Sequence, residues 1–283
     1  MTRRSAISLC IFTFISALSI TSLASHSNPK FTGINFSQYK VSFQKTLTTV
    51  TDNLSGITYS SDTDSLFAII NNPEQIVELD KQGKILRQIP LTRFVDTEGI
   101  TYLGQGHFAL TQERQRSVSV VEITSLTRTI DVSGAKQFNL KPAVDNNAGL
   151  EGIAWSAQSG LFVANEHSPS EIIHLPSTLI SGLGPHATDH GNIMPRFLDN
   201  LPLDDISGLH FTEQAEQLLV LSDESRELLA IDADGTIHSQ FDLSPGWFGF
   251  NPYLEQPEGV TMDNHGLIYI VGEPNNLLVL APQ

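Results

Sequence analysis

The chain has 283 residues, of which 40% are hydrophobic and 17% charged, so it has enough apolar residues for a core and too few charges for a disordered protein. Its 31 acidic residues outnumber 16 basic ones and give a formal net charge of −15. A surface of this sign repels the phosphates of nucleic acids and attracts cations. We therefore expect no nucleic-acid partner.

Residues 1–24 have the layout of a secretory signal peptide. Arg3 and Arg4 form a short basic start, residues 6–23 are apolar, and residues 23–25 (Leu-Ala-Ser) offer a cleavage site. An uncleaved membrane anchor is the alternative, because the apolar stretch almost reaches the ~20 residues that span a bilayer. In both cases we expect an exported protein, in the periplasm or on the outer face of the cell membrane. The only cysteine, Cys10, lies in this segment, so the rest of the chain has no disulfide.

Five short segments then share one pattern, in which a glutamate or serine precedes a glycine and an aliphatic residue. They are Ser55-Gly56-Ile57, Glu98-Gly99-Ile100, Glu151-Gly152-Ile153, Ser207-Gly208-Leu209 and Glu258-Gly259-Val260. A turn and two further apolar runs follow each copy. The runs are short, partly β-branched or aromatic, and bounded by Gly, Asp and Asn, so we interpret them as strands.

This repeat predicts an all-β fold, a β-propeller with four-stranded blades over residues 36–283. The fifth copy has only three strands before the chain ends, whereas one unpaired strand, residues 39–47, precedes the first copy. If this N-terminal strand completes the last blade, the ring has five blades and leaves no edge open. Six blades remain the alternative, with the extra blade inside residues 133–149 or 176–195.

The repeat also predicts a set of side chains around one end of the axis. In a blade, the first strand begins on the face where the second, antiparallel strand ends. Residues that open the first strand should therefore lie beside residues that close the second. The opening residues are Ser55, Glu98, Glu151, Ser207 and Glu258, and the closing residues, 15 or 16 positions later, are Asn71, Glu113, Glu166, Asp223 and Glu273.

Carboxylates gathered in this way raise one another's pKa and destabilise the fold unless a cation joins them. Calcium accepts 6–8 oxygen ligands in flexible geometry, and the absence of His and Cys from these positions argues against zinc or copper. We therefore predict a Ca²⁺ site formed by Glu98, Glu113, Glu151, Glu166, Asp223, Glu258, Glu273 and Asn71. The alternative is that the acidic residues only cap backbone N–H groups between blades.

One connection before the fifth blade is rich in aromatic residues. Trp247, Phe248, Phe250 and Tyr253 lie between Pro245 and Pro257. This segment either binds a ligand or partner over the acidic mouth or forms a hydrophobic plug between blades.

The Glu-Gly-Ile/Val openings, the closing pair Asn165-Glu166 and the stretch Gly149–Trp155 resemble the SdiA-regulated (YjiK-type) family of Gram-negative bacteria. The similarity runs from about Phe36 to Ala281 and includes the N-terminal export segment. It implies a propeller in the cell envelope, associated with the membrane, with kinship to calcium-dependent propellers such as phytases and lactonases. Ser55 and Ser207 depart from the acidic opening residue, so a complete ligand set is not transferred.

Three functions remain open on this basis. The first is an exported, monomeric calcium-binding propeller that acts as a binding or scaffolding module for a small ligand or an envelope protein. The second is a calcium-dependent hydrolase of lactones or phosphoesters, with Glu166 or Glu113 as the base. The third is a propeller whose carboxylates are only structural. Only Arg114 and Arg116 lie near a closing residue, which disfavours a highly phosphorylated substrate.

Overall fold

The computed structural model describes residues 33–140, 149–167, 169–178, 196–198, 200–246 and 254–283. The chain separates into two compact units, Met1–Lys30 and Phe31–Gln283, and all described elements belong to the second. The proposed signal or anchor segment and the aromatic residues 247–253 lie outside the described residues. No helix in the described part of the chain is long and apolar enough to cross a bilayer.

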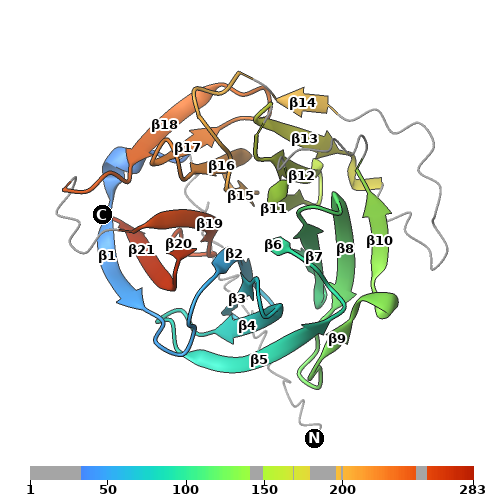
Figure 1. The fold of residues 1–283 in the computed structure, drawn as a ribbon. Helices are drawn as coiled ribbons and strands as arrows, with labels where there is room; N and C mark the ends of the chain where they lie inside the picture. The colour runs from blue at the N-terminus through green and yellow to red at the C-terminus, as the bar shows by residue number, and fades with distance from the viewer. Residues whose placement is uncertain (1–32, 141–148, 168, 179–195, 199, 247–253) are drawn as a thin grey trace, which may run out of the picture. The chain divides into compact units, whose positions relative to one another are not determined.

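The described strands form five antiparallel blades around a central axis, which confirms the predicted β-propeller and its blade number (Figure 1). From the axis outward, blade 1 contains β2 (Leu54–Ser60), β3 (Ser65–Ile70), β4 (Gln75–Leu79) and β5 (Ile85–Thr92). Blade 2 contains β6 (Thr97–Gly104), β7 (His107–Gln112), β8 (Ser117–Glu122) and β10 (Lys136–Asn139). Blade 3 contains β11 (Leu150–Ser156), β12 (Gly160–Asn165), β13 (Glu171–Leu175) and β14 (Arg196–Leu198).

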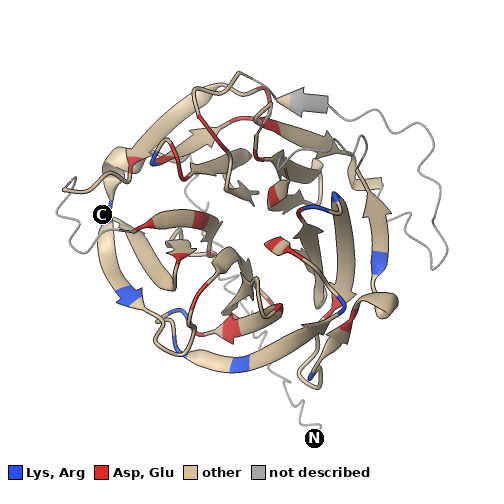
Figure 2. Cartoon of the chain, viewed as in Figure 1, with Lys and Arg blue, Asp and Glu red and all other residues tan. Residues whose placement is uncertain are grey.

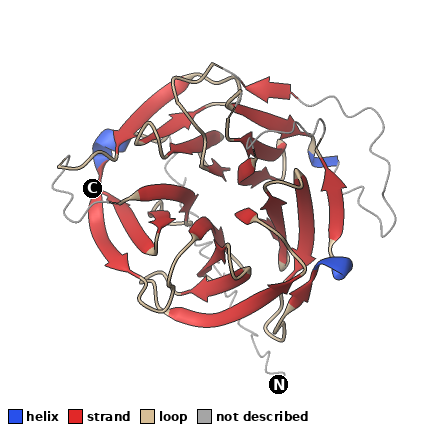
Figure 3. Ribbon diagram, viewed as in Figure 1, coloured by secondary structure: helices blue, strands red, loops and turns tan. Residues whose placement is uncertain are grey.

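Blade 4 contains β15 (Gly208–Thr212), β16 (Gln217–Ser222), β17 (Glu227–Ile231) and β18 (Ile237–Asp242). Blade 5 contains β19 (Gln256–Met262), β20 (Ile268–Glu273), β21 (Asn276–Pro282) and, as its outer strand, β1 (Tyr39–Thr46). The structure also contains two 3₁₀ turns, η1 (Phe36–Gln38) and η2 (Val132–Gly134). Strands are the main secondary structure throughout the described residues (Figure 3).

The N-terminal strand closes the ring, as the strand count predicted. β1 pairs antiparallel with β21 from Tyr39 opposite Pro282 to Thr46 opposite Asn276. The backbone N–H of Gln283 also donates to the carbonyl of Gln38 at 2.7 Å. Because the last blade combines both ends of the propeller sequence, its outer edge is paired and the ring cannot open without breaking this strand pair.

One strand was not expected from the repeat. β9 (Ile130–Asp131) pairs in parallel with β5, through Ile130 opposite Leu91, and makes the first sheet five-stranded. It lies in the connection between β8 and β10, where the chain crosses the outer edge of blade 1. The two-residue strand is too short to give a recognisable sequence pattern.

The core consists of five apolar clusters, one between each pair of neighbouring blades. On β3, Leu66 and Ala68 contact blade 5, whereas the alternate residue Phe67 contacts blade 2. The ring centroids of Phe67 and Phe108 lie 4.6 Å apart across that second interface. Strands buried on both faces need apolar residues at every position, which explains the continuous apolar runs in the sequence.

Candidate functional site

The motif glycines bring the innermost strands together at the axis. A Cβ atom on Gly56 would lie 2.6 Å from the carbonyl oxygen of Glu98, and one on Gly99 would lie 2.4 Å from that of Glu151. At the closing point of the ring, a Cβ on Gly259 would lie 2.7 Å from the carbonyl oxygen of Ser55. These approaches are too close for any side chain, so glycine is required for the backbones to meet. The residue before each glycine is therefore held beside the axis.

Closing residues lie beside opening residues, as the offset predicted. The N–H groups of Asn71, Glu113 and Glu166 donate to the carbonyl oxygens of Asn53, Asp96 and Gly149, each two residues before an opening residue, at 3.1, 2.8 and 3.1 Å. In blade 4, Asp223 N–H instead donates to the Asp205 carboxylate at 3.1 Å. In blade 5, Glu273 pairs with Gln256, again two residues before the opening residue. The five blades therefore present their acidic residues at one end of the axis.

Blades 2 and 3 bring the carboxylates into two overlapping groups. In each group, one oxygen from each of three residues lies within 4.8 Å of the other two. The groups are Asp96, Glu98 and Glu113, and Glu113, Glu151 and Glu166. Glu113 belongs to both and is itself buried. Figure 2 shows this acidity at the axial ends of the innermost strands β6 and β11.

Gly149 makes the second group possible. A Cβ atom there would lie only 1.8 Å from Cγ of Glu113. Any side chain at residue 149 would therefore push Glu113 away from Glu151 and Glu166. The Gly149–Trp155 stretch, noted in the sequence, thus allows blade 3 to pack against the Glu113 side chain.

The other predicted ligands lie at the same mouth without joining these groups. Asn71 donates from Nδ2 to Glu98 at 2.5 Å and to Asp96 at 3.3 Å. Glu258 is close enough to Asp223 and Glu273 for their charges to raise its pKa. The structure therefore gathers Glu98, Glu113, Glu151 and Glu166 most closely and places Asp223, Glu258 and Glu273 on the other side of the mouth.

The pKa values of these carboxyl groups are raised. Burial, followed by the charges of Asp96 and Glu113, raises the pKa of Glu98 to about 8, although Ser55 and Asn71 partly offset this effect. Burial and the negative charges around it raise the pKa of Glu258 to about 9.

Glu151 has the most crowded position. Burial, then the charges of Glu98, Glu166, Glu258 and Glu113, raises its pKa well above the ordinary value. No hydrogen bond to its carboxylate is found among the described residues. Burial and Asp96 raise the pKa of Glu113 to about 7. The mouth therefore carries more negative charge than its own protein groups neutralise.

In the described ion pairs of the mouth, the positive groups lie at its margin. Arg114 Nε lies 2.9 Å from Asp96 and 4.0 Å from Glu113, and most of the Arg114 side chain is exposed. Arg226 is 3.8 Å from Asp223, and His167 Nε2 is 3.0 Å from Glu166. None of these ion pairs includes Glu98, Glu151 or Glu258, so the opening residues have no cationic partner among the described ion pairs.

Asp96 and Asp205 were missed by the sequence interpretation. Asp205 is buried and accepts hydrogen bonds from Ser222 Oγ, Asp223 N and Glu224 N, so it caps the turn after β16. Both aspartates stand two residues before an opening residue, in Asp-Thr-Glu-Gly and Asp-Ile-Ser-Gly. This shared position is the sequence feature from which both aspartates could have been identified. In blade 4, the backbone-capping role therefore belongs to Asp205 and not to the opening residue Ser207.

The donor set suits a hard divalent cation. Every side-chain atom in the two groups that could bind a metal is a carboxylate oxygen. The neighbouring Asn71 and Ser55 add only amide and hydroxyl groups. Calcium prefers such ligands and tolerates irregular geometry. Binding would also remove the repulsion that raises the pKa values of Glu98, Glu113 and Glu151. The residues thus fit Ca²⁺ in ligand type, number and charge.

Three solved structures of similar fold are distant from this chain in sequence. A glutaminyl cyclase from Myxococcus xanthus matches with a TM-score of 0.59 and 11% identity over 86% of this chain and 95% of that one. A luciferin-regenerating enzyme gives 0.52 and 13% identity over 85% and 80% of the two chains. A gluconolactonase from Xanthomonas campestris gives 0.50 and 12% identity over 85% and 89%. At these identities the likeness extends to the fold alone.

The sequence comparison is more specific. The SdiA-regulated family matches residues 32–281, which include all five blades and the closing strand β1. This agrees with the resemblance noted from the Glu-Gly repeats. The chain therefore belongs to the SdiA-regulated family.

Proposed function

We propose that this protein is an exported propeller of the cell envelope that binds Ca²⁺ at the acidic mouth of its axis and acts there as a binding module. One observation carries the proposal: Glu113, Glu151 and Glu166 approach within 4.8 Å through their carboxylate oxygens. Glu151 among them has no cationic partner in the described ion pairs. Such a group is unfavourable by itself and favourable around a cation.

Glu98, Glu113, Glu151 and Glu166 are the core of the proposed calcium site, with Asp96 beside them. Asp223, Glu258 and Glu273 lie around them and add negative potential when they are ionised, whereas Asn71 donates a hydrogen bond to Glu98. The basic start and apolar stretch of residues 1–24 support export. A calcium site is compatible with export, since extracellular modules bind the ion even with affinities of roughly 10⁻⁴–10⁻³ M.

A melting experiment tests this site. The purified protein is heated at pH 7.5 in chelator and then in increasing calcium. At a free calcium concentration 100 times the Kd, the free energy of unfolding should rise by about 2.7 kcal/mol. Magnesium should stabilise less, because it demands a tight octahedron. An unchanged Tm at 10 mM calcium would remove the proposal.

A hydrolase is the second candidate, and the pKa of Glu113, raised to about 7, favours it. A carboxylate that titrates near neutrality is suited to accept a proton from water as a general base. Lactones fit better than phosphoesters, because Arg114 is the one Lys or Arg side chain paired with the two carboxylate groups among the described ion pairs, and His167 is the other basic partner there. Turnover of a lactone panel that is lost in Glu113→Gln, measured at a calcium concentration that saturates the variant, would assign the enzyme role. Calcium binding without turnover would leave the binding role.

A further inference from the structure

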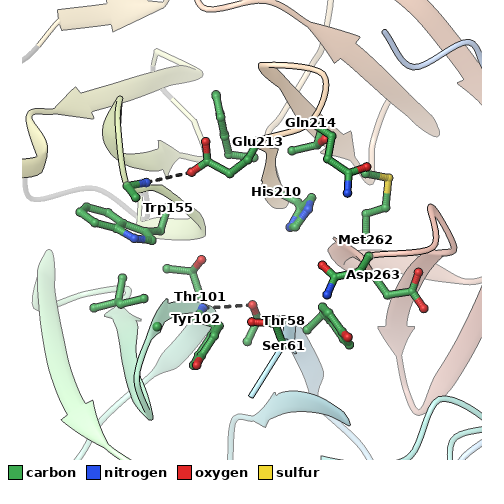
Figure 4. Close-up of a pocket in the computed structure, with 17 residues that line it drawn as sticks. Thr58, Ser61, Thr101, Tyr102, Trp155, His210, Glu213, Gln214, Met262 and Asp263 are labelled. Carbon is green, nitrogen blue, oxygen red and sulfur yellow. Dashed lines mark hydrogen bonds between the residues drawn. The ribbon is translucent and has the colours of Figure 1, made fainter. Parts of the chain in front are cut away.

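The opposite mouth of the propeller contains a pocket that the acidic site does not use. It has a volume of about 290 Å³ and is formed by the far ends of the innermost strands of all five blades (Figure 4). Thr58, Thr101, Trp155, His210 and Met262 each come from a different blade. Protein pockets of roughly 300 Å³ and above enclose small molecules, so this one is of a size for a single small ring.

The two mouths are separate sites. Between them, the axis narrows to a space of about 10 Å³ lined by the motif glycines and the aliphatic residues that follow them. That volume holds one water at most. Along β6, Glu98 and Tyr102 are four residues apart, which is about 13 Å in an extended strand. A ligand in the pocket therefore does not touch the carboxylates of the acidic mouth.

Hydrogen bonds fix the protonation of His210. Thr261 Oγ1 accepts a hydrogen bond from the Tyr59 N–H at 3.0 Å and lies 3.2 Å from His210 Nδ1. Thr261 is fully buried, and the imidazole is the one acceptor that the described residues offer to its hydroxyl proton. Nδ1 therefore accepts, and the neutral ring carries its proton on Nε2. Burial also lowers the pKa of His210 to about 4, so the ring stays neutral at physiological pH.

Nε2–H of His210 is thus a neutral donor in a pocket, without a protein partner among the described residues. A ligand that pairs with this N–H group must provide an oxygen acceptor. The hydroxyl of Thr101 likewise has no partner in the described part of the chain and offers a second polar contact. A cation without an oxygen acceptor would leave the Nε2–H donor unpaired.

The remaining lining is apolar or uncharged except for Glu213 and Asp263, and the buried Asp263 carboxylate already accepts from His265 N, Leu267 N and the Tyr269 hydroxyl. Trp155 and Met262 provide apolar surface on opposite sides of the pocket (Figure 4). Gln214 and Asn264 add amides, and Glu213 adds a carboxylate that accepts from Ala157 N–H at 2.9 Å. No Lys or Arg is among the described lining residues, so an anion would find no countercharge.

We propose that this mouth binds an uncharged sugar, one monosaccharide unit in size. A pyranose has an apolar C–H face for Trp155, and its hydroxyl oxygens accept from His210 Nε2 and bond with Thr101. The amides and the carboxylate at the margin suit its other hydroxyl groups. The aromatic face of Tyr59 is less suited to this role, because Lys81 Nζ already lies 5.9 Å from its centroid.

Ligand-detected NMR titrations test the site, with methyl glucoside, methyl galactoside and N-acetylglucosamine as probes. At least one neutral sugar should bind saturably, and glucose 6-phosphate should bind at least tenfold more weakly. His210→Leu removes the donor and should weaken binding roughly tenfold or more. His210→Gln keeps an N–H group near the Nε2 position and should retain most of the affinity. Binding should be constant between pH 6 and 8, because His210 does not titrate there.

Matched variants separate this site from the acidic mouth and from misfolding. Thr101→Val keeps the side-chain shape and should weaken binding severalfold with an unchanged Tm. Glu151→Gln at the other mouth should have no effect on the sugar affinity. The proposal is overturned if none of the three sugars binds saturably, or if His210→Leu and Thr101→Val leave the affinity unchanged. Loss of sugar binding in chelator would overturn the proposal as well, because this result would show that the sugar binds at the acidic mouth.

Discussion

Acidic side chains at the acidic mouth differ in the hydrogen bonds that they accept. Asp205 accepts hydrogen bonds from two backbone N–H groups and one hydroxyl. Glu151 has no comparable donors in the described part of the chain, and four other carboxylates raise its pKa. The same chemical group therefore caps a turn at one position and is available for a cation at the other. The hydrogen-bond donors around each carboxylate, and not the residue type, decide which of these roles it has.

Glu151→Gln separates these roles. At pH 9, where the carboxyl groups are driven to ionise, the substitution removes one repelling charge and should raise the Tm of the calcium-free protein by roughly 2–4 °C, or about 1 kcal/mol. The same change should weaken calcium binding at least tenfold. Thermal melts with chelator and with calcium measure both effects. Glu122→Gln, an identical change on an exposed residue of β8, is the control and should alter neither.

A structural cap would give a different result at Glu151. The lost hydrogen bonds would lower the Tm equally with and without calcium, because they have no link to the ion. Equal losses would contradict the proposed site. At the residue scale, the sequence predicted which acidic residues face the mouth. It did not predict that Glu113 joins two groups, because this depends on how closely its side chain packs against Gly149.

At the scale of the element, the repeated glycine controls how closely the innermost strands approach. The strands themselves were predictable, because each is a short apolar run bounded by turn residues. Asp80–Gly83 forms a hairpin turn, in which the N–H of Gly83, with a φ of +72°, donates to the carbonyl of Asp80 at 2.9 Å. Strand β9 was not predictable, since its partner β5 lies about 40 residues earlier and the pairing depends on the folded ring.

Gly99→Ala tests the axial contact. The new Cβ atom would lie 2.4 Å from the carbonyl oxygen of Glu151 and 2.7 Å from Thr111 Oγ1, so blades 2 and 3 must separate. We expect a loss of about 1–3 kcal/mol in the free energy of unfolding and a weaker calcium affinity. Thermal and calcium titrations measure the two quantities.

Gly134→Ala is the matched control for this change. No atom lies within 4 Å of a Cβ built there, and its backbone is outside the positive-φ region. The control should leave the Tm within about 2 °C of the parent. If the two alanine variants melt alike, the glycine motif has no special part in closing the axis.

For the whole molecule, ring closure makes one mouth out of five distant sequence segments. β1 and β21 join the ends of the propeller, so blade 5 contacts blade 1 as well as blade 4. The group that carries the proposed site joins Glu113 of blade 2 to Glu151 and Glu166 of blade 3, so no single blade forms it. The number of blades and their closure were predictable from the repeat and the orphan strand. The pKa values of the carboxyl groups at the mouth were not predictable, because they depend on distances around the closed ring.

The pH dependence of stability reports on that ring as one unit. The pKa values of Glu98 and Glu258 are raised to about 8 and about 9, whereas an unfolded glutamate titrates near pH 4.3. Between pH 6.5 and 9 the folded calcium-free protein therefore binds more protons than the unfolded chain, and its stability must fall as the pH rises. His210, with its pKa lowered to about 4, changes stability only below pH 6.5, so this window excludes it.

Over this window we expect the calcium-free protein to lose about 2–3 kcal/mol, after allowing for screening by solvent, and its Tm to fall by roughly 5–10 °C. Saturating calcium should remove or reverse the fall, because the ion binds the ionised carboxylates and competes with protons. Melting curves at pH 6.5, 7.5, 8.2 and 9, each with chelator and with calcium, give both slopes. Parallel slopes in the two conditions would show that the ion does not bind the titrating carboxylates. A Tm in chelator that does not change with pH would show that repulsion between the carboxylates does not destabilise the mouth.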